Sequence, residues 1–174
     1  PTPPDADFLR RLLALINETR FLPAAVVIDE PDADGVRFRD GNGLRVLAID
    51  LSDGYRAVLS LALDLLRRLA FEHGYDGVFA DASSHVVGLD GLVLIDEVDA
   101  HLHPTWQQRI GMWFKERFPR VQFFVATHSP IVCQAADSVL LLPAPGDDNP
   151  PRMATHEELD RLRYGDLLDA FSTT

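Results

Sequence analysis

Two acidic residues, Asp96 and Glu97, directly follow the uncharged run Leu92-Val-Leu-Ile95. The run predicts a strand, which would fix both carboxylates at its carboxyl end. An aspartate held there can bind Mg²⁺ beside the β- and γ-phosphates of a nucleotide, usually through water. The adjacent glutamate can orient and deprotonate an attacking water. The alternative interpretation is a buried strand that ends at the protein surface with two solvent-exposed acidic residues, which then have no catalytic role.

Residues 52–54, Ser-Asp-Gly, stand where a long helical pattern begins. The first N–H groups of a helix lack intrahelical partners, and together with the positive helix end they favour an anion. Gly54 would let a phosphate of another molecule approach closely, and Ser52 would add a hydroxyl. The alternative is that Ser52 or Asp53 only caps the helix.

His128 follows the apolar run 121–126, where a ring N–H could contact a γ-phosphate; the alternative is a structural histidine. A different chemistry is open to His101 and His103. Together with His128 and the two acids they could form a transition-metal site. The protein would then be a metal-dependent phosphohydrolase.

Strands and helices alternate in the part of the chain that would position these residues. Helical stripes cover 54–74 and 104–118, the second opened by a proline, which is favoured at a first helical position. Buried parallel strands are predicted at 92–95, 121–126 and 138–142. Ligands of such sheets lie at the carboxyl ends of the strands, where the two acids and His128 both fall.

The N-terminal part follows another pattern. An amphipathic helix is predicted over 7–19, and short β-rich runs separated by Asp/Gly turns predict an antiparallel meander at 25–28, 36–38 and 44–47. After a Pro-rich linker at 143–151, a further helix is predicted over 156–171. We therefore expect an α/β fold with a parallel sheet core, flanking helices and a short antiparallel N-terminal meander.

Composition narrows the function. The 174 residues suffice for one domain, and the net charge of -11 argues against direct binding of nucleic acid, because phosphate contacts need Lys and Arg. No apolar run approaches the roughly 18 residues of a membrane span, so no membrane partner is expected. Cys133 is the single cysteine, which favours a reducing, cytoplasmic location. No signal peptide is visible at the start of the sequence. Because the sequence does not begin with Met, we expect a processed or excised piece.

The sequence resembles the ABC-class ATPase heads, in the branch that contains SMC-, RecF- and OLD-like proteins and bacterial ATPases often named AAA. Three segments carry the resemblance in the family's order: Leu51-Ser-Asp-Gly-Tyr-Arg56 resembles the signature motif, Asp96–Pro104 a Walker B running into the D-loop, and Ala126-Thr-His-Ser-Pro130 the switch-histidine segment. Gly165–Leu168 resembles the close of such domains. The resemblance spans most of residues 20–170.

The resemblance implies a P-loop NTPase-like fold that binds ATP and Mg²⁺ and works as an ATP-sandwiched dimer. The site residues it implies are Asp96 for Mg²⁺, Glu97 and His128 for catalysis, and Ser52, Gly54 and Asp99 for ATP and the second subunit. In the family the signature segment binds the γ-phosphate of a nucleotide held mainly by that second subunit, and the D-loop acid communicates across the dimer. An effector protein, such as a nuclease in DNA repair or anti-phage defence, is a further expected partner.

One part of an ATPase head is missing from the sequence. No Gly-rich loop of the form GxxxxGK[ST], which would cradle the phosphates, is present, and the sole lysine, Lys115, lies within a predicted helix. Residues 1–174 are therefore predicted to be a single C-terminal half-domain, inactive alone and completed by a homodimer partner or an N-terminal ATPase half. The alternatives are a non-catalytic interaction module that keeps the fold and the phosphohydrolase above.

Overall fold

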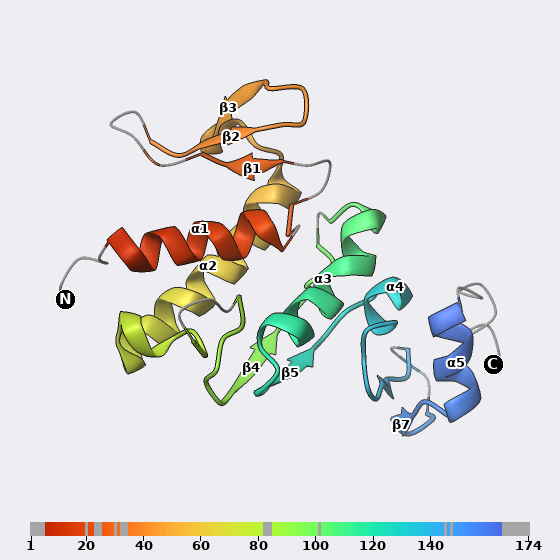
Figure 1. Cartoon of the computed structure of the whole chain (residues 1–174). Coiled ribbons are helices and arrows are strands. Elements are labelled where there is room, and N and C mark those ends of the chain that lie inside the picture. The colour runs from red at the N-terminus through yellow and green to blue at the C-terminus, as the bar shows by residue number, and fades with distance from the viewer. Residues whose placement is uncertain are drawn as a thin grey trace.

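The structure, a computed structural model, describes residues 6–19, 21–22, 26–29, 31, 35–81, 85–100, 102–144, 146 and 148–164. His101 and Gly165–Leu168, named above, lie outside these residues. The first helices and strands are α1 Ala6–Glu18, β1 Val27–Ile28, β2 Arg37–Arg39, β3 Arg45–Leu47, α2 Asp53–His73 and β4 Gly91–Ile95. They are followed by α3 Pro104–Arg117, β5 Val121–Val125, α4 Pro130–Cys133, β6 Leu140–Leu141, β7 Arg152–Met153 and α5 His156–Tyr164 (Figure 1).

The N-terminal meander forms as predicted. β1, β2 and β3 pair antiparallel in that order, with Ile28 opposite Phe38. α1 is tied to β1 by Asn17, whose amide donates to the Ile28 carbonyl at 2.9 Å and accepts from the Ile28 N–H at 2.8 Å. Because one side-chain amide pairs both backbone groups of Ile28, Asn17 takes the place of a neighbouring strand there.

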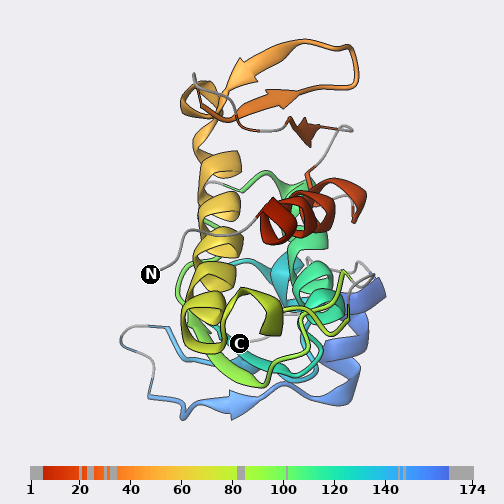
Figure 2. The same cartoon turned by 60° about the vertical axis from the view of Figure 1, so that its left-hand side comes forward.

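The long helix α2 confirms the helix predicted from Gly54. It begins beside the three-stranded sheet and runs away from it along the molecule (Figure 2). Its buried stripe consists of Val58, Leu59, Ala62, Leu65, Leu66 and Ala70. Beyond its end, Tyr75 and Phe79 pack on Phe8 of α1, with ring centroids 4.9 and 6.1 Å apart. No helix in the described ranges has both the length and the apolar character needed to cross a bilayer.

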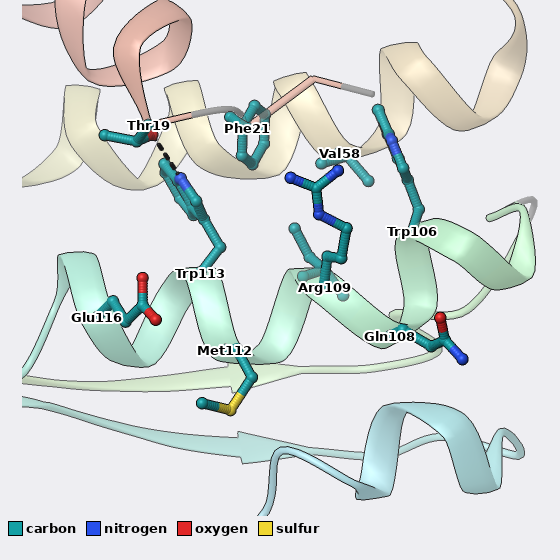
Figure 3. A pocket seen from close by; sticks show the side chains of 10 residues that line it. Thr19, Phe21, Val58, Trp106, Gln108, Arg109, Met112, Trp113 and Glu116 are labelled. Carbon is teal, nitrogen blue, oxygen red and sulfur yellow. Dashed lines mark hydrogen bonds between the residues drawn. The ribbon is translucent and has the colours of Figure 1, made fainter. Parts of the chain in front are cut away.

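The aromatic helix α3 lies between α1 and α2 on one side and β4 and β5 on the other. On the first side, the Trp113 ring lies 4.3 Å from that of Phe21, and its indole N–H donates to the Thr19 hydroxyl at 2.7 Å (Figure 3). On the second side, Phe114 lies 5.3 Å from the ring of Phe123 in β5. The helix begins at its proline as predicted and joins the two halves of the core.

The pairing of β4 with β5 confirms the predicted parallel sheet, but the prediction that both strands are buried is wrong. Val93 and Phe123 face the core, whereas Leu92, Leu94 and Phe124 are 64%, 75% and 55% exposed. We call these three residues the open face. A parallel sheet is ordinarily covered on both sides. Within the described residues α3 covers one side, and the side chains of the open face remain in solvent.

The predicted third parallel strand at 138–142 is also wrong. Only β6 forms there, and it pairs antiparallel with β7 rather than parallel with β5. The N–H of Ala154 donates to the Val139 carbonyl at 2.8 Å, so residues after the linker occupy one edge of this strand. Val139 then packs on Leu159 of α5, which begins at the predicted position.

The close approach of α3 to α4 provides a test of this packing. An added Cβ at Gly111 would lie 2.5 Å from the Ala135 Cβ. Gly→Ala inside a helix normally stabilises by about 1 kcal/mol, but relieving this overlap would cost about 1–3 kcal/mol. Gly111→Ala is therefore expected to lower the free energy of unfolding, measured by urea denaturation. Adding Ala135→Gly should recover the loss; a Gly111→Ala protein more stable than the parent would contradict the close approach.

Candidate functional site

Asp96 and Glu97, here called the acid pair, stand directly after β4, and both side chains are exposed. In the described part of the chain neither carboxylate forms an ion pair or a side-chain hydrogen bond. Among the non-glycine residues described, Glu97 alone has a positive φ, of 50°. This left-handed conformation costs roughly 1–2 kcal/mol for most residues. Stability therefore does not explain why a glutamate occupies the position.

The turn after the acid pair is fastened to the end of β5. The Thr127 hydroxyl donates to the carboxylate of half-buried Asp99, and the same hydroxyl accepts from the Ser129 N–H at 3.0 Å. Beside this link, the Ala126 N–H donates to the Ile95 carbonyl at 2.9 Å and continues the pairing of the two strands. The segments that follow β4 and β5 therefore lie against each other.

A second set of hydrogen bonds runs from Ser129 into α3. Its side chain is buried, and the hydroxyl donates to Gln107 Oε1 at 2.6 Å and accepts from the Ile131 N–H at 3.2 Å. Gln107 Nε2 in turn donates to the Leu102 carbonyl at 2.9 Å. Thr127 and Ser129 lie in the segment that resembles the switch-histidine segment, but no role of their own was predicted for them or for Gln107. A Thr and a Ser flanking a histidine at a strand end could have indicated the first two.

The histidines separate into different roles. His128 is exposed and lies between the two hydrogen-bonded residues of the switch segment. His103 is the N-cap of α3, where its Nδ1 accepts from the Thr105 N–H at 3.3 Å. Among the described residues no group of three or more His, Cys, Asp and Glu side chains could hold a metal ion. The described residues therefore give no support to the transition-metal alternative.

Ser52 is the N-cap residue of α2 and is exposed, but its side chain makes no capping hydrogen bond. Only its carbonyl is used, accepting from the Arg56 N–H at 3.1 Å. Gly54 lies half-buried in the first turn, and Asp53 forms an ion pair with the Arg56 guanidinium. The interpretation of Ser52 as a side-chain cap is therefore not what the structure shows, and its hydroxyl faces solvent.

The start of α2 is held against the start of α3. The rings of Tyr55 and Trp106 lie 4.7 Å apart, and Trp106 points from α3 toward α2 in Figure 3. Burial in this contact raises the pKa of Tyr55. Both views nevertheless place the start of α2 well away from the carboxyl ends of β4 and β5. The structure thus gathers the acid pair, Asp99 and His128, and leaves Ser52 and Gly54 apart from them.

The pocket with the best-defined lining lies away from the predicted site residues. A groove of about 310 Å³ opens between α1, α2 and α3, with Phe21, Val58 and Arg109 among its lining residues (Figure 3). None of the predicted site residues lines this groove. The predicted site is consequently an exposed edge of the sheet and not a cavity.

Cys133, at the end of α4, lies near the same edge. Burial raises the pKa of its thiol, and the negative charge of Asp99 raises that pKa further. Asp99 therefore faces Thr127 on one element and Cys133 on another, and the thiol reports on the charge of Asp99.

Comparison with known proteins gives a family and relatives. The family model described as AAA domain, putative AbiEii toxin, Type IV TA system matches residues 2–134. The chain is 39% identical to the Retron Ec83 probable ATPase of Escherichia coli over 99 residues, which are 57% of this chain and 17% of that protein. It is 34% identical to the Septu protein PtuA of Bacillus mycoides (strain KBAB4) over 114 residues, 66% of this chain and 14% of that one. The chain thus spans less than a fifth of the length of these curated relatives.

Solved structures agree on the fold. A structure described under "Structural biochemistry of ATP-driven dimerization and DNA stimulated activation of SMC ATPases" has a TM-score of 0.58 and 16% identity, covering 92% of this chain and 91% of that chain. The Smc head domain with a coiled coil and joint from Pyrococcus yayanosii has a TM-score of 0.54 and 17% identity, covering 91% and 29%. The chain therefore has the P-loop NTPase fold of SMC ATPase heads, and the expected fold class is confirmed.

The placement of Asp99 can be measured through Cys133, the only cysteine in the sequence. Asp99→Asn should lower the pKa of the thiol, because one of the two causes that raise it disappears while burial remains. The rate of alkylation by iodoacetamide as a function of pH reports this pKa. Asp90→Asn, at the other end of β4, is the matched control and should leave the profile unchanged. An unchanged profile in Asp99→Asn would show that the two side chains do not face each other.

Proposed function

The chain belongs to the family described as AAA domain, putative AbiEii toxin, Type IV TA system, and from this premise we propose that residues 1–174 are the C-terminal half of an ABC-like ATPase head. The complete head hydrolyses ATP as an ATP-sandwiched dimer and transmits the result to an effector protein, such as a nuclease. Two relatives are named for a retron and for Septu, which supports a role beside such an effector. Because the chain has a net charge of -11, we expect any DNA to be bound by other parts of the assembly and not by these residues.

The observation that carries the proposal is the meeting of two strand ends. The acid pair follows β4 and His128 follows β5, and the parallel pairing brings these carboxyl ends to the same edge. Glu97 is held there with a φ of 50°, although another residue type would fit that backbone better. Strained backbone of this kind concentrates at functional sites. A catalytic carboxylate accounts for both the position and the strain.

The residues present fit Mg²⁺. Asp96, Glu97 and Asp99 contribute three negative charges within four positions, so a triphosphate would be repelled without a cation. The exposed carboxylate of Asp96 offers the oxygen ligand that Mg²⁺ prefers, and the exposed edge leaves room for the waters that this ion retains. When bound, the ion neutralises charge on the phosphates during transfer. Glu97 then orients the attacking water and accepts its proton, and His128 donates a hydrogen bond to the γ-phosphate.

The open face supports the assignment to half a head. Full burial of a Leu or Phe side chain stabilises a protein by about 1.5–3 kcal/mol, and three such side chains are exposed on β4 and β5. The Gly-rich loop and lysine that cradle phosphates are also absent from the sequence. A single N-terminal ATPase half, on the same polypeptide or another, would supply both the cover and the loop.

The dimer accounts for the separation of the signature segment from the other site residues. Because the start of α2 lies away from the ends of β4 and β5, Ser52 does not serve the nucleotide bound at those ends. Its exposed hydroxyl, at the N-terminal end of α2, is instead available to a phosphate held by a second subunit. Two heads placed face to face thereby complete each other's sites.

Replacement of the acid pair tests the proposed chemistry in the complete protein. Glu97→Gln should still bind ATP and accumulate as an ATP-bound dimer, while turnover falls roughly 10²–10⁴-fold, because the amide keeps the size of the side chain but cannot act as a base. Asp96→Ala should instead weaken Mg²⁺-dependent nucleotide binding itself. Steady-state turnover, nucleotide affinity and melting temperature are measured together for both variants.

A control at the same position separates catalysis from folding. Glu97→Gly relieves the left-handed backbone, so the melting temperature should be unchanged or higher while turnover is lost. A structural role would make activity and melting temperature fall together. The alternative of a non-catalytic interaction module, favoured by the missing phosphate loop, gains support if the complete protein has no turnover. Turnover of Glu97→Gln at the parental rate would remove the catalytic assignment.

The role of Ser52 toward a second subunit has its own test. Ser52→Arg should leave ATP binding by each monomer intact and block ATP-driven dimerisation, because the helix start would present bulk and no hydroxyl to the opposing phosphate. Sedimentation velocity with and without ATP measures the dimer. Ser60→Arg, an exposed position two turns along the same helix, is the matched control and should still dimerise. Normal ATP-dependent dimers of Ser52→Arg would show that the signature assignment is wrong.

A further inference from the structure

The groove between α1, α2 and α3 lies apart from the proposed ATPase site. It holds about 310 Å³, and its lining comes from the residues that follow α1, from α2 and from α3 (Figure 3). The two tryptophans of the sequence, Trp106 and Trp113, both stand in its walls. We propose that this groove binds a segment of a partner protein in the polyproline II conformation, in which prolines separate an acidic and a basic residue three positions apart. The inference goes beyond the proposed function and does not depend on ATP hydrolysis.

The apolar part of the lining fits the middle of such a segment. Besides the two tryptophans, Phe21, Val58 and Ile110 contribute to it. Grooves lined by aromatic side chains are the sites that receive polyproline II segments, because the rings of the groove pack on the prolyl rings and the ligand is already ordered before it binds.

The indole N–H of Trp106 has no acceptor within the part of the chain that the structure describes. The side chain is 6% exposed, and its Nε1 forms no hydrogen bond there. The corresponding N–H of Trp113 donates to the Thr19 hydroxyl at 2.7 Å, so one tryptophan of the groove is satisfied and the other is not. A buried N–H without an acceptor destabilises a fold. A polyproline II segment has no internal hydrogen bonds, so its carbonyl groups are available to Trp106.

The polar wall beside Trp113 favours proline over other residues of an extended segment. The Thr19 hydroxyl is engaged twice, since it donates to the Leu15 carbonyl and accepts from Trp113. A ligand N–H that faced this wall would compete for an oxygen already in use. Proline has no backbone N–H and leaves no donor unpaired there.

Two charged side chains of α3 determine the charges of the segment. Arg109 and Glu116 are exposed, both line the groove, and Figure 3 shows Arg109 beside Trp106 and Glu116 beyond Trp113. Seven residues of an α-helix rise about 10.5 Å. Three residues of polyproline II rise about 9.3 Å and return a side chain to the same side of the segment. An acidic group opposite Arg109 and a basic group opposite Glu116 therefore fit three positions apart.

The existing ion pair of Glu116 does not prevent this contact. Its carboxylate is bonded to the Arg117 guanidinium at 3.3 Å, and the Glu116 side chain is 57% exposed. Ion pairs of such exposure contribute little to stability, so the carboxylate can be shared with a basic group of the ligand.

The test measures the binding of short peptides to the complete protein by isothermal titration calorimetry. Acetyl-Glu-Pro-Pro-Arg-amide has the proposed spacing, and acetyl-Glu-Arg-Pro-Pro-amide has the same composition with adjacent charges. The first should bind about fivefold more tightly, because the second cannot place both charges opposite their partners. Trp106→Phe keeps an aromatic ring and lacks the indole N–H, so it should weaken the first peptide about two- to tenfold.

Reversal of one charge should change which peptide is preferred. Arg109→Glu places two acids along the groove and should bind acetyl-Arg-Pro-Pro-Arg-amide more tightly than acetyl-Glu-Pro-Pro-Arg-amide, whereas the parent should show the opposite preference. Arg161→Glu in α5, an exposed arginine outside the groove, is the matched control and should bind as the parent does. If Arg109→Glu does not fold, Arg109→Gln should bring the affinities of the two peptides together.

The outcomes separate this inference from the proposed function. Absence of peptide binding, equal affinity of the parent for the two spacings, or unchanged binding by the Trp106 and Arg109 variants would overturn the inference. A change in sedimentation of Arg109→Glu without peptide would show that the groove holds a second copy of the chain, which also overturns it. Parental turnover of Glu97→Gln would remove the catalytic assignment and leave the peptide groove standing.

Discussion

The rest of the structure depends on the packing of α3 between two layers. Trp113 joins the helix to the N-terminal layer through the Phe21 ring and the Thr19 hydroxyl, and Phe114 joins it to β5. Aromatic pairs of this geometry stabilise a fold by about 0.5–1.5 kcal/mol beyond the contribution of their buried area. The helix is therefore held on both sides. Since α3 begins directly after the Asp99 turn and its Trp106 touches the start of α2, this packing sets where each predicted site segment lies.

The residues with the least favourable local structure are the acid pair, to which we assign the catalytic role. The acid pair is exposed and has no ion-pair partner among the described residues, and Glu97 has a left-handed backbone conformation. The neighbouring Asp99 turn and the end of β5 compensate with backbone pairing and with the bonds of Thr127 and Ser129. A rigid support beside a strained, solvated edge is the arrangement that preorganised sites require.

The sequence predicted those elements whose partners lie within the chain. α2 and α3 were predictable because their apolar stripes pack on other described elements. Asp96, Glu97 and His128 were predicted as site residues from their types at strand ends, and they do follow β4 and β5. The exposure of the open face was not predictable, since an apolar run favours a buried strand and does not say whether a covering layer lies within the same residues. The link from Thr127 to Asp99 spans 28 residues, and no local pattern encodes a contact at that separation.

The open face also has a consequence for how the protein is made. The strands that carry it, Leu-Val-Leu-Ile and Val-Gln-Phe-Phe-Val, are uncharged, rich in β-forming residues and free of proline, which is the composition of segments that pair between chains. While the open face is exposed, newly synthesised copies can associate with one another through it, at a rate that rises with their concentration. Under the proposed completion by an N-terminal half, the speed with which that half docks on the open face would therefore decide how much of the product escapes aggregation.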